Sequence, residues 1–549
     1  MSLHRWSAIF LSFLIGFWIM ASVGQAKVMA AGGDNLACHV VAAHEASPAE
    51  KAYLAGNASQ AESLYREALG KAPHDATLTA GLVRSLVRQD KVADAASTIN
   101  AELSLAPNSV PLLTAWAEVQ YRQGKIAEAA ATADQALRID PCSARLYLFR
   151  ARVLRLNSMF ASEQRAIAIA HGLDPWDMDI RRTWLGTLPL APRIDQQKQF
   201  LDAANGMDSE ERARMEKGLA NLERWASNPP DKTCHLVSTA SSTELPLAPV
   251  FGEGGIRHIQ SWGLRVLFNN NLANLAVDTG ASGLLVNRAI AERAGLKPIG
   301  KTQLGGVGDQ GAQGGYLASA DSVKVGSLEF RDCIVRVTDR KDILGMDGLI
   351  GTDVFSSYLV TLDYPLRKFM LSQLPPRPTD TTNSAVTLNT EAADSAESGG
   401  PQDRYISPTM KDFVPVFRSG HYLIVPVVLN GKASRLFMVD TGSFSTTISQ
   451  EAARAVTKVH SGGEVTVKGL SGEVANVSFS DAISFQFAGI RQQNNDLVTF
   501  DTAGLSRGAG VEISGFLGST LLRQLTISID YRDGLMRFDY DPRHGNHNF

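Results

Sequence analysis

The chain has 549 residues, of which 44% are hydrophobic and 20% are charged, and its formal net charge is -3. These fractions are ordinary for a soluble globular protein, and the length predicts about three or four domains. A net charge this small, with acidic and basic residues mixed along the chain, excludes the electrostatic pattern of a nucleic-acid-binding protein.

The N-terminus has the pattern of a secretory signal peptide over residues 1–26. His4 and Arg5 precede the apolar run WSAIFLSFLIGFWIMASV, and Gly24 and Ala26 then supply the small residues of a cleavage site. An uncleaved membrane anchor is the alternative, because the run is only 18 residues long. Either outcome predicts an exported protein, periplasmic or secreted, with membrane contact only if the segment is retained.

Four cysteines are spread far apart along the chain: Cys38, Cys142, Cys234 and Cys333. No C-x-x-C pair is present, so the sequence does not predict a zinc site. An oxidising compartment permits disulfides, and four cysteines allow three pairings, among which the spacing does not choose.

A 34-residue period follows, marked by Pro73, Pro107, Pro141 and Pro175. Twelve residues before these prolines stand Ala61, Ala95, Ala129 and Glu163. Small residues let two helices of a hairpin approach closely, and each proline begins the next connection, where no backbone donor is needed. The region resembles the tetratricopeptide repeat (TPR) family from residue 47 to about residue 185, with Glu102 and Glu163 as departures from the small-residue pattern.

We expect a TPR-like helical array over residues 36–226. The stretch DSEERARMEKGLANLERWAS would close it, because the exposed end of such an array must be polar. The resemblance implies docking of a protein partner or a protein substrate. A packing scaffold or spacer is the alternative interpretation.

Two later regions, residues 245–374 (lobe 1) and 413–541 (lobe 2), repeat six features in the same order. Each has a strand hairpin, an Asp-Thr-Gly turn, a short helix, a glycine-rich hairpin, an apolar-apolar-Gly segment and a strand ending in Asp-Tyr. This order predicts a duplicated β-domain. Between the copies, residues 375–412 are rich in Pro, Thr, Ser and acidic residues, a composition typical of a flexible linker.

The turns read Asp278-Thr279-Gly280-Ala281 and Asp440-Thr441-Gly442-Ser443, and LIG at 349–351 and FLG at 516–518 follow them. Through these motifs each half resembles a lobe of a retropepsin-like aspartic protease, and the resemblance covers about half of the chain. The implied fold is multidomain, an all-α TPR solenoid followed by an all-β bilobal retropepsin-like fold. The resemblance implies no metal or other cofactor.

The chemistry explains why two aspartates are needed. Two carboxylates about 3 Å apart cannot both ionise, so they share one proton. One of Asp278 and Asp440 would then act as a base on a water molecule, while the other donates a proton to the substrate carbonyl. The sequence therefore predicts an exported aspartic endopeptidase that hydrolyses protein or peptide substrates with a catalytic unit formed within one chain.

The resemblance also assigns roles to neighbouring residues. Thr279 and Thr441 would cross-link the two loops through their hydroxyls, and Gly280 and Gly442 would let the backbone turn tightly. Two glycine-rich flaps would close over the substrate and exclude water, marked by Gly305, Gly306, Gly308, Gly469 and Gly472.

One asymmetry between the loops is readable, because Ser443 stands where the first loop has Ala281. A serine hydroxyl that hydrogen-bonds a carboxylate stabilises its charged form. We therefore predict that Asp440 holds the charge of the pair and that Asp278 holds the proton.

Two glycine-rich segments in lobe 1 match nucleotide-binding patterns in letters only. GLKPIGKT (295–302) follows a helix rather than a strand, and GVGDQG (306–311) opens no helix, so we predict no nucleotide site. The alternative function comes from another class: a TPR adaptor whose protease-like half is a catalytically inert peptide-binding module.

Overall fold

The computed structural model describes residues 25–29, 35–41, 46–203, 209–227, 234–251, 259–309, 311–378, 401–461, 467–474 and 476–543. Nearly all of the predicted signal segment and most of the predicted linker lie outside the described residues. Within the described ranges, no helix combines the length and the apolar character that a bilayer span requires.

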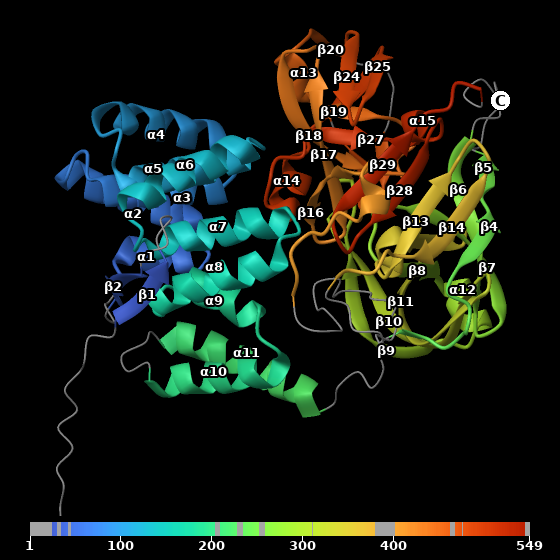
Figure 1. Ribbon diagram of the computed structural model, residues 1–549, viewed down its shortest axis with the longest axis horizontal. Coiled ribbons are helices and arrows are strands. Elements are labelled where there is room, and N and C mark those ends of the chain that lie inside the picture. The colour runs from blue at the N-terminus through green and yellow to red at the C-terminus, as the bar shows by residue number, and fades with distance from the viewer. Residues whose placement is uncertain are drawn as a thin grey trace, which may run out of the picture.

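A helical array forms the first half, and consecutive helices pack in pairs (Figure 1). Its helices are α1 (Pro48–Leu54), α2 (Ala58–Lys71), α3 (Ala76–Arg88), α4 (Val92–Leu105), α5 (Val110–Arg122), α6 (Ile126–Ile139), α7 (Ala144–Leu156), α8 (Phe160–Leu173), α9 (Met178–Gly186), α10 (Leu190–Ala203) and α11 (Ser209–Ser227).

The 34-residue period has a direct packing basis in this array. The periodic alanines Ala61, Ala95 and Ala129 are fully buried between the helices of a pair. Glu163, the departure in the fourth unit, is also buried, and its carboxylate lies 3.1 Å from an Arg155 guanidinium nitrogen. A buried charge is tolerated only when paired, so this ion pair lets a glutamate occupy an alanine position.

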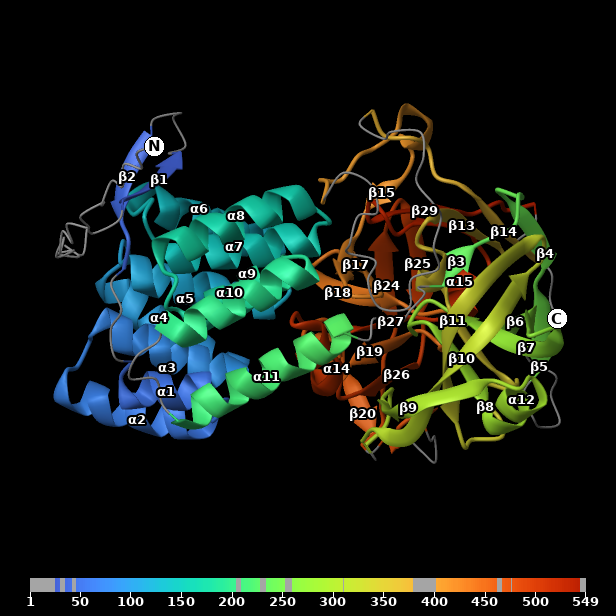
Figure 2. The same ribbon diagram turned by 90° about the horizontal axis from the view of Figure 1, so that it is seen from below.

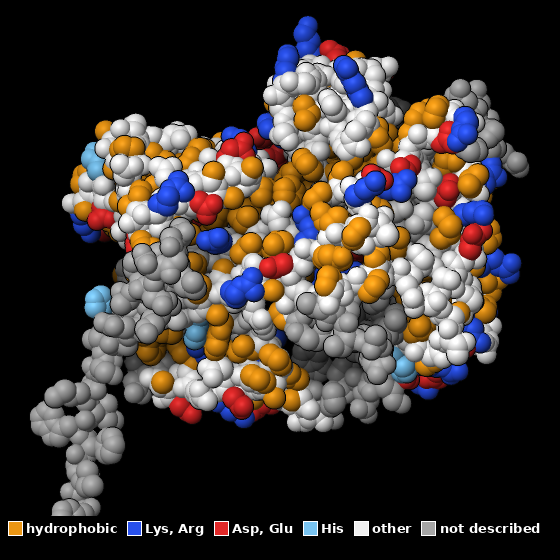
Figure 3. Space-filling view, in the orientation of Figure 1, with side chains coloured by type: hydrophobic (Ala, Val, Ile, Leu, Met, Phe, Trp, Pro, Cys, Tyr) orange, Lys and Arg blue, Asp and Glu red, His pale blue; other side chains and the backbone are white. Residues whose placement is uncertain are grey.

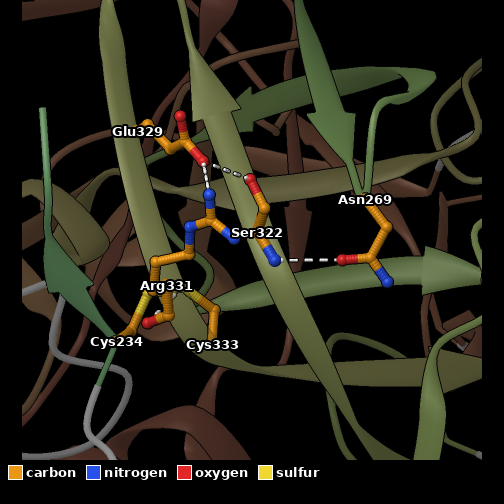
Figure 4. The surroundings of a disulfide bond; sticks show 6 residues. All are labelled: Cys234, Asn269, Ser322, Glu329, Arg331 and Cys333. Atoms are coloured by element: carbon orange, nitrogen blue, oxygen red, sulfur yellow. Dashed lines mark hydrogen bonds and ion pairs between the residues drawn. A yellow bond between two sulfur atoms is a disulfide. The ribbon is translucent and has the colours of Figure 1, made fainter.

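Two disulfides select one of the three possible pairings. Cys38 bonds Cys142, which ties the β1–β2 hairpin (Gln25–Met29 and Asn35–His39) to the turn before α7. Cys234 bonds Cys333, which joins the entry of lobe 1 to strand β11 (Figure 4).

Lobe 1 is a nine-stranded sheet in the order β3-β11-β8-β12-β7-β6-β10-β9, with β5 paired to β6. The strands are β3 (His235–Leu236), β5 (Ala248–Phe251), β6 (Ile259–Phe268), β7 (Asn271–Asp278), β8 (Leu284–Asn287), β9 (Lys297–Leu304), β10 (Gln313–Val325), β11 (Leu328–Thr338) and β12 (Gly348–Gly351), with helix α12 (Arg288–Arg293) after β8. The P-loop-like segment therefore lies largely in strand β9 and opens no helix.

Lobe 2 repeats this plan in a ten-stranded sheet, β20-β23-β26-β19-β27-β18-β17-β24-β25, with β16 paired to β17. The elements are β16 (Phe417–Ser419), β17 (Tyr422–Leu429), β18 (Ala433–Val439), β19 (Thr447–Ser449), α13 (Gln450–Arg454), β20 (Val459–Ser461), β23 (Ser478–Ser480), β24 (Ile483–Phe487), β25 (Ile490–Asn494), β26 (Leu497–Phe500), α14 (Ala503–Ala509), β27 (Gly515–Leu517) and α15 (Ser519–Leu522). A separate two-stranded sheet is formed by β21 (Val467–Gly469) and β22 (Gly472–Val474).

A third sheet joins the lobes, in the order β15-β29-β28-β13-β14-β4. Its strands are β4 (Thr243–Pro246), β13 (Tyr358–Asp363), β14 (Lys368–Gln373), β15 (Val414–Pro415), β28 (Thr526–Asp530) and β29 (Leu535–Asp539). The two strands that end in Asp-Tyr, β13 and β28, pair antiparallel at its centre. The repeated motif thus builds the bridge between the lobes, and one apolar core runs through both.

The helical array packs against lobe 2 (Figures 1 and 2). Ile126 and Leu156 from the array share an apolar cluster with Leu436 and Phe516 of lobe 2. One end of the predicted linker is also held at this junction, since Asp403 accepts hydrogen bonds from the backbone and hydroxyl of Ser162.

Candidate active site

The two Asp-Thr-Gly turns meet where the lobes face each other. Strand β7 ends at Asp278, and β12 runs parallel to it with Gly351 beside Asp278. In lobe 2, Asp440 follows β18, and its backbone N–H donates to Leu517 of the parallel strand β27 at 3.0 Å. The LIG and FLG segments therefore lie next to the aspartate loops and hold their backbones in place.

The carboxyl groups of Asp278 and Asp440 form a hydrogen bond with each other, and both residues are buried, with exposures of 9% and 8%. Burial raises the pKa of Asp278. Burial, together with the neighbouring charge of Asp278, raises the pKa of Asp440 well above its ordinary value. The pair therefore holds one proton, as two adjacent buried carboxyls must.

The threonines form a symmetric cross-link. The Thr279 hydroxyl donates to the Val439 carbonyl at 2.7 Å, and the Thr441 hydroxyl donates to the Val277 carbonyl at 3.0 Å. Each hydroxyl oxygen also accepts from the other threonine's backbone N–H, both at 3.0 Å. All four residues are buried, so these bonds hold the loops in one relative position.

Close approach explains the glycines of the two loops. A Cβ atom at Gly280 would lie 2.7 Å from the Asp440 carboxyl carbon, and one at Gly442 would lie 2.4 Å from that of Asp278. Each glycine also uses its N–H to donate to the aspartate of its own loop, at 2.7 Å for Gly280 and 3.0 Å for Gly442. Any side chain here would force the carboxyls apart.

The prediction about Ser443 is wrong. Its hydroxyl donates to the Ser445 carbonyl at 3.0 Å, and only its backbone N–H reaches Asp440, also at 3.0 Å. The hydroxyl that distinguishes Ser443 from Ala281 therefore adds no contact to the aspartate pair. Burial raises the pKa of both carboxyls, so the pair shares one proton, and the Ser443 hydroxyl gives no reason to place the charge on Asp440.

Two glycine-rich hairpins meet above the cleft. The turn between β9 and β10 carries Gly305, Gly306 and Gly308, and the β21–β22 turn is flanked by Gly469 and Gly472. The Ser471 N–H donates to the Val307 carbonyl at 2.9 Å, so the two tips are in contact.

Glycine is required at this contact. A Cβ atom at Gly308 would lie 2.3 Å from the Ser471 backbone, and one at Gly469 would lie 2.2 Å from the Val307 carbonyl oxygen. Gly308 and Gly472 also have positive φ angles of 131° and 95°. The contact between the flap tips therefore depends on residues that carry no side chain.

Sequence reasoning missed His421, which precedes β17. Its Nε2–H donates to the Gly280 carbonyl at 3.2 Å, and its ring packs against Tyr422. Burial lowers the His421 pKa to about 4, so the ring is neutral at neutral pH. A lone histidine carries no sequence signal for bonding to the aspartate loop, because His421 and Gly280 belong to different lobes.

Tyr364 and Tyr531 are the tyrosines of the two Asp-Tyr pairs, which the sequence identifies only as markers of the repeat. The Tyr364 ring lies 5.5 Å from that of Trp262 between their centroids, and the Tyr531 hydroxyl lies 2.6 Å from that of Thr352. Both tyrosines are buried. Their occurrence in both halves was the available signal for a supporting role beneath the loops.

A continuous cleft of about 2480 Å³ contains the aspartate pair. Asp278 and Asp440 lie on its wall, and flap residues such as Gly306 and Leu470 line it as well. The site therefore combines a shared proton, a roof and enough space for an extended peptide, the arrangement needed for acid–base attack on an amide.

Comparison with known families finds similarity in both parts of the chain. Residues 264–354 and 425–521 match the aspartyl protease family, and residues 52–115 match the tetratricopeptide repeat family. The chain is thus similar to the aspartyl protease family over one segment in each lobe. Both matched segments of the protease domain contain one Asp-Thr-Gly loop, and the TPR match lies within the helical array.

Solved structures of low identity resemble parts of the chain. An aspartic proteinase from Irpex lacteus is 12% identical, covers 56% of this chain and 99% of its own, and has a TM-score of 0.32. A thermophilic TPR protein from Thermus thermophilus is 18% identical, covers 32% of this chain and 95% of its own, and has a TM-score of 0.26. Among curated proteins, none matches this chain.

Proposed function

We propose that this chain is an exported aspartic endopeptidase in which Asp278 and Asp440 act together on a water molecule. The observation that carries the proposal is the buried, hydrogen-bonded pair of carboxyls, one from each lobe, beneath two flaps in contact. Similarity to the aspartyl protease family supports the reaction class.

The shared proton gives the two carboxyls different tasks. The ionised member of the Asp278/Asp440 pair takes a proton from the water while the protonated member donates its proton to the carbonyl oxygen of the substrate. Water oxygen bonds to the peptide carbon and gives a tetrahedral diol. Transfer of a proton to the nitrogen breaks the C–N bond and releases an amine and a carboxylic acid, with no other reactant.

The remaining loop residues position this pair in the proposal. Thr279 and Thr441 hold the loops, while Gly280 and Gly442 permit the approach of the carboxyls. The backbone N–H groups of Ala281 and Ser443 orient the carboxylate oxygens, and the flap glycines allow the roof to close: Gly305, Gly306, Gly308, Gly469 and Gly472. Closure excludes water, which strengthens electrostatic effects within the site.

Export and docking are further parts of the proposal. The N-terminal pattern supports export, and so do the two disulfides, because such bonds persist mainly in oxidising compartments. The TPR region supports docking of a protein partner or substrate, since such arrays bind proteins.

The test uses the purified full chain and an unfolded protein over a series of pH values. We expect cleavage by the wild type, and none by Asp278→Asn or by Asp440→Asn. Asp539→Asn, a partly exposed aspartate in β29, is the matched control and should cleave normally. Inhibition by a statine-type compound would provide independent support.

The alternative, a TPR adaptor with an inert peptide-binding module, predicts a different result. In that case the wild type would bind the unfolded protein at every pH and leave it intact. Binding without cleavage would therefore replace the protease proposal with the adaptor.

A further inference from the structure

The active-site cleft does not end at the protease domain. Its lining includes Asp90 from the turn before α4, Val92 and Ala93 from the start of α4, and Arg122 and Gln123 from the end of α5. These residues line the same continuous cleft as the aspartate pair. The ends of two helical hairpins of the array therefore form part of the cleft wall.

An ion-pair bridge fixes this wall to lobe 2. An Arg122 guanidinium nitrogen lies 2.8 Å from the Asp90 carboxylate, and Arg122 also donates to the Ser506 carbonyl at 2.9 Å. Arg507 of helix α14 reaches the other oxygen of Asp90 at 3.1 Å. Because one carboxylate links arginines from both halves, the turns keep a defined position beside the cleft.

Apolar packing supports the same placement. Gly124, which has a φ angle of 73°, lies in the turn before α6, where an added Cβ would lie 3.2 Å from the Leu436 side chain of lobe 2. Ile126, the next apolar residue, is buried in a cluster with lobe 2 residues. Apolar side chains also gather on the molecular surface where the helical array meets the β lobes (Figure 3).

The odd-numbered helices of the array carry their own charge network. Glu50 from α1 pairs with Arg84 of α3 at 3.2 Å and with Arg145 of α7 at 3.1 Å. Arg145 also pairs with Asp177, the N-cap of α9, at 2.8 Å. These ion pairs engage the charged groups of this face, whereas the cleft-side surface also presents the exposed, uncharged Ala93 beside its own ion pairs.

We propose that the turns preceding α4 and α6 form a distal substrate-binding surface, which contacts an extended polypeptide beyond the segment held under the flaps. The proposal rests on the protease function proposed above. Its occupant is the substrate chain itself, because the surface is continuous with the cleft that holds the aspartate pair. Val92 and Ala93 supply uncharged contacts, so the surface suits unfolded polypeptide rather than one charged motif.

A binding experiment tests the surface without requiring catalysis. At roughly 3.3 Å per extended residue, labelled peptides of about 8 and about 25 residues differ in whether they reach beyond the flaps. Both are titrated by fluorescence anisotropy against the full chain carrying Asp278→Asn. We expect Ala93→Glu to raise the Kd of the long peptide about fivefold and to leave that of the short peptide unchanged.

Ala101→Glu is the matched control, because Ala101 is also exposed on α4 but does not line the cleft. It should leave both Kd values unchanged. Equal Kd values for Ala93→Glu and its parent, or an equal loss with both peptides, would overturn the distal surface. Failure of the protease proposal would show separately, as absence of cleavage by the wild type.

Discussion

Lobe 1 and lobe 2 each contain an Asp-Thr-Gly loop, but the two loops have different surroundings. Their Asp-Thr-Gly turns make matching threonine bonds across the interface. The attachments of the lobes differ: a disulfide is bonded to strand β11 of lobe 1, while lobe 2 has the helical array packed against it. Two carboxyls can meet only if the loops that carry them have nearly the same geometry. Each lobe, in contrast, can be stabilised by different contacts.

The difference extends to the residues just behind the loops. In lobe 1, Asp353 follows the apolar-apolar-Gly segment and accepts from the Gly283 N–H at 2.9 Å and the Ser282 hydroxyl at 2.8 Å. Lobe 2 has Thr520 at the corresponding place, where its N–H donates to the Phe444 carbonyl at 3.0 Å. The duplicated loop thus has a titratable support on one side only.

The largest effect should come from the one feature that the lobes must share. Asp278→Asn and Asp440→Asn are each expected to lower kcat by at least about 10²-fold, and the double variant should lose little more, because the residues act as a unit. Single-turnover kinetics on a peptide measures this. A double variant whose loss is the product of the single losses would show that the carboxyls act separately.

The disulfide provides the next largest contrast. Removal of Cys234–Cys333 by a double alanine substitution should cost about 2–4 kcal/mol, because the bond closes a long loop in the unfolded chain. Hydrogen exchange should rise more in β3 and β11 than in β28 or β29. Removal of Cys38–Cys142 is the control, and it should loosen the helical array instead.

Variants of the two threonines test whether the loops contribute equally to the free energy of unfolding. Thr279→Val and Thr441→Val each remove a hydroxyl that accepts a buried N–H, so each should lower the free energy of unfolding by about 1–3 kcal/mol. Urea unfolding of the two variants should give similar losses. A large difference between them would mean that one loop holds the pair and the other follows it.

The last effects concern the pH dependence of stability, and they have opposite signs in the two lobes. Burial raises the Asp353 pKa to about 6, so its stabilising contribution is full below its ordinary pKa of 3.8 and is lost as pH rises through about 6. Burial lowers the His421 pKa to about 4, so its contribution is full above its ordinary pKa of 6.5 and is lost as pH falls through about 4.

Asp353→Asn and His421→Gln should therefore change the slope of unfolding free energy against pH in opposite directions between pH 4 and 6. Each change is expected to be about 1–3 kcal/mol across the window. Thermal unfolding at a series of pH values provides the measurement. Parallel slopes for the two variants would contradict the opposite signs.

Much of this architecture was predictable because it is periodic or repeated. The 34-residue proline spacing predicted helical pairs, and the buried alanines explain why the spacing persists. The duplicated order of features predicted two lobes and brought Asp278 and Asp440 into one hypothesis. A repeat carries this information because each unit must solve the same packing problem with similar residues.

Other features could not be predicted, because they depend on contacts between distant residues. The Ser443 hydroxyl had two possible acceptors within its own loop, and only the backbone path sends it to Ser445 instead of Asp440. His421 reaches Gly280 across the lobe interface. The choice of disulfides likewise follows from which cysteines the fold brings together.

The sequence by itself determined the elements: paired helices, two aspartate turns with their glycines, and two hairpins rich in glycine. Local spacing suffices for these, because backbone geometry and side-chain size act over a few residues. Only the tertiary structure decided that the Ser443 hydroxyl turns away from Asp440 and that TPR turns border the cleft. Both depend on burial and on neighbours that lie far apart along the chain.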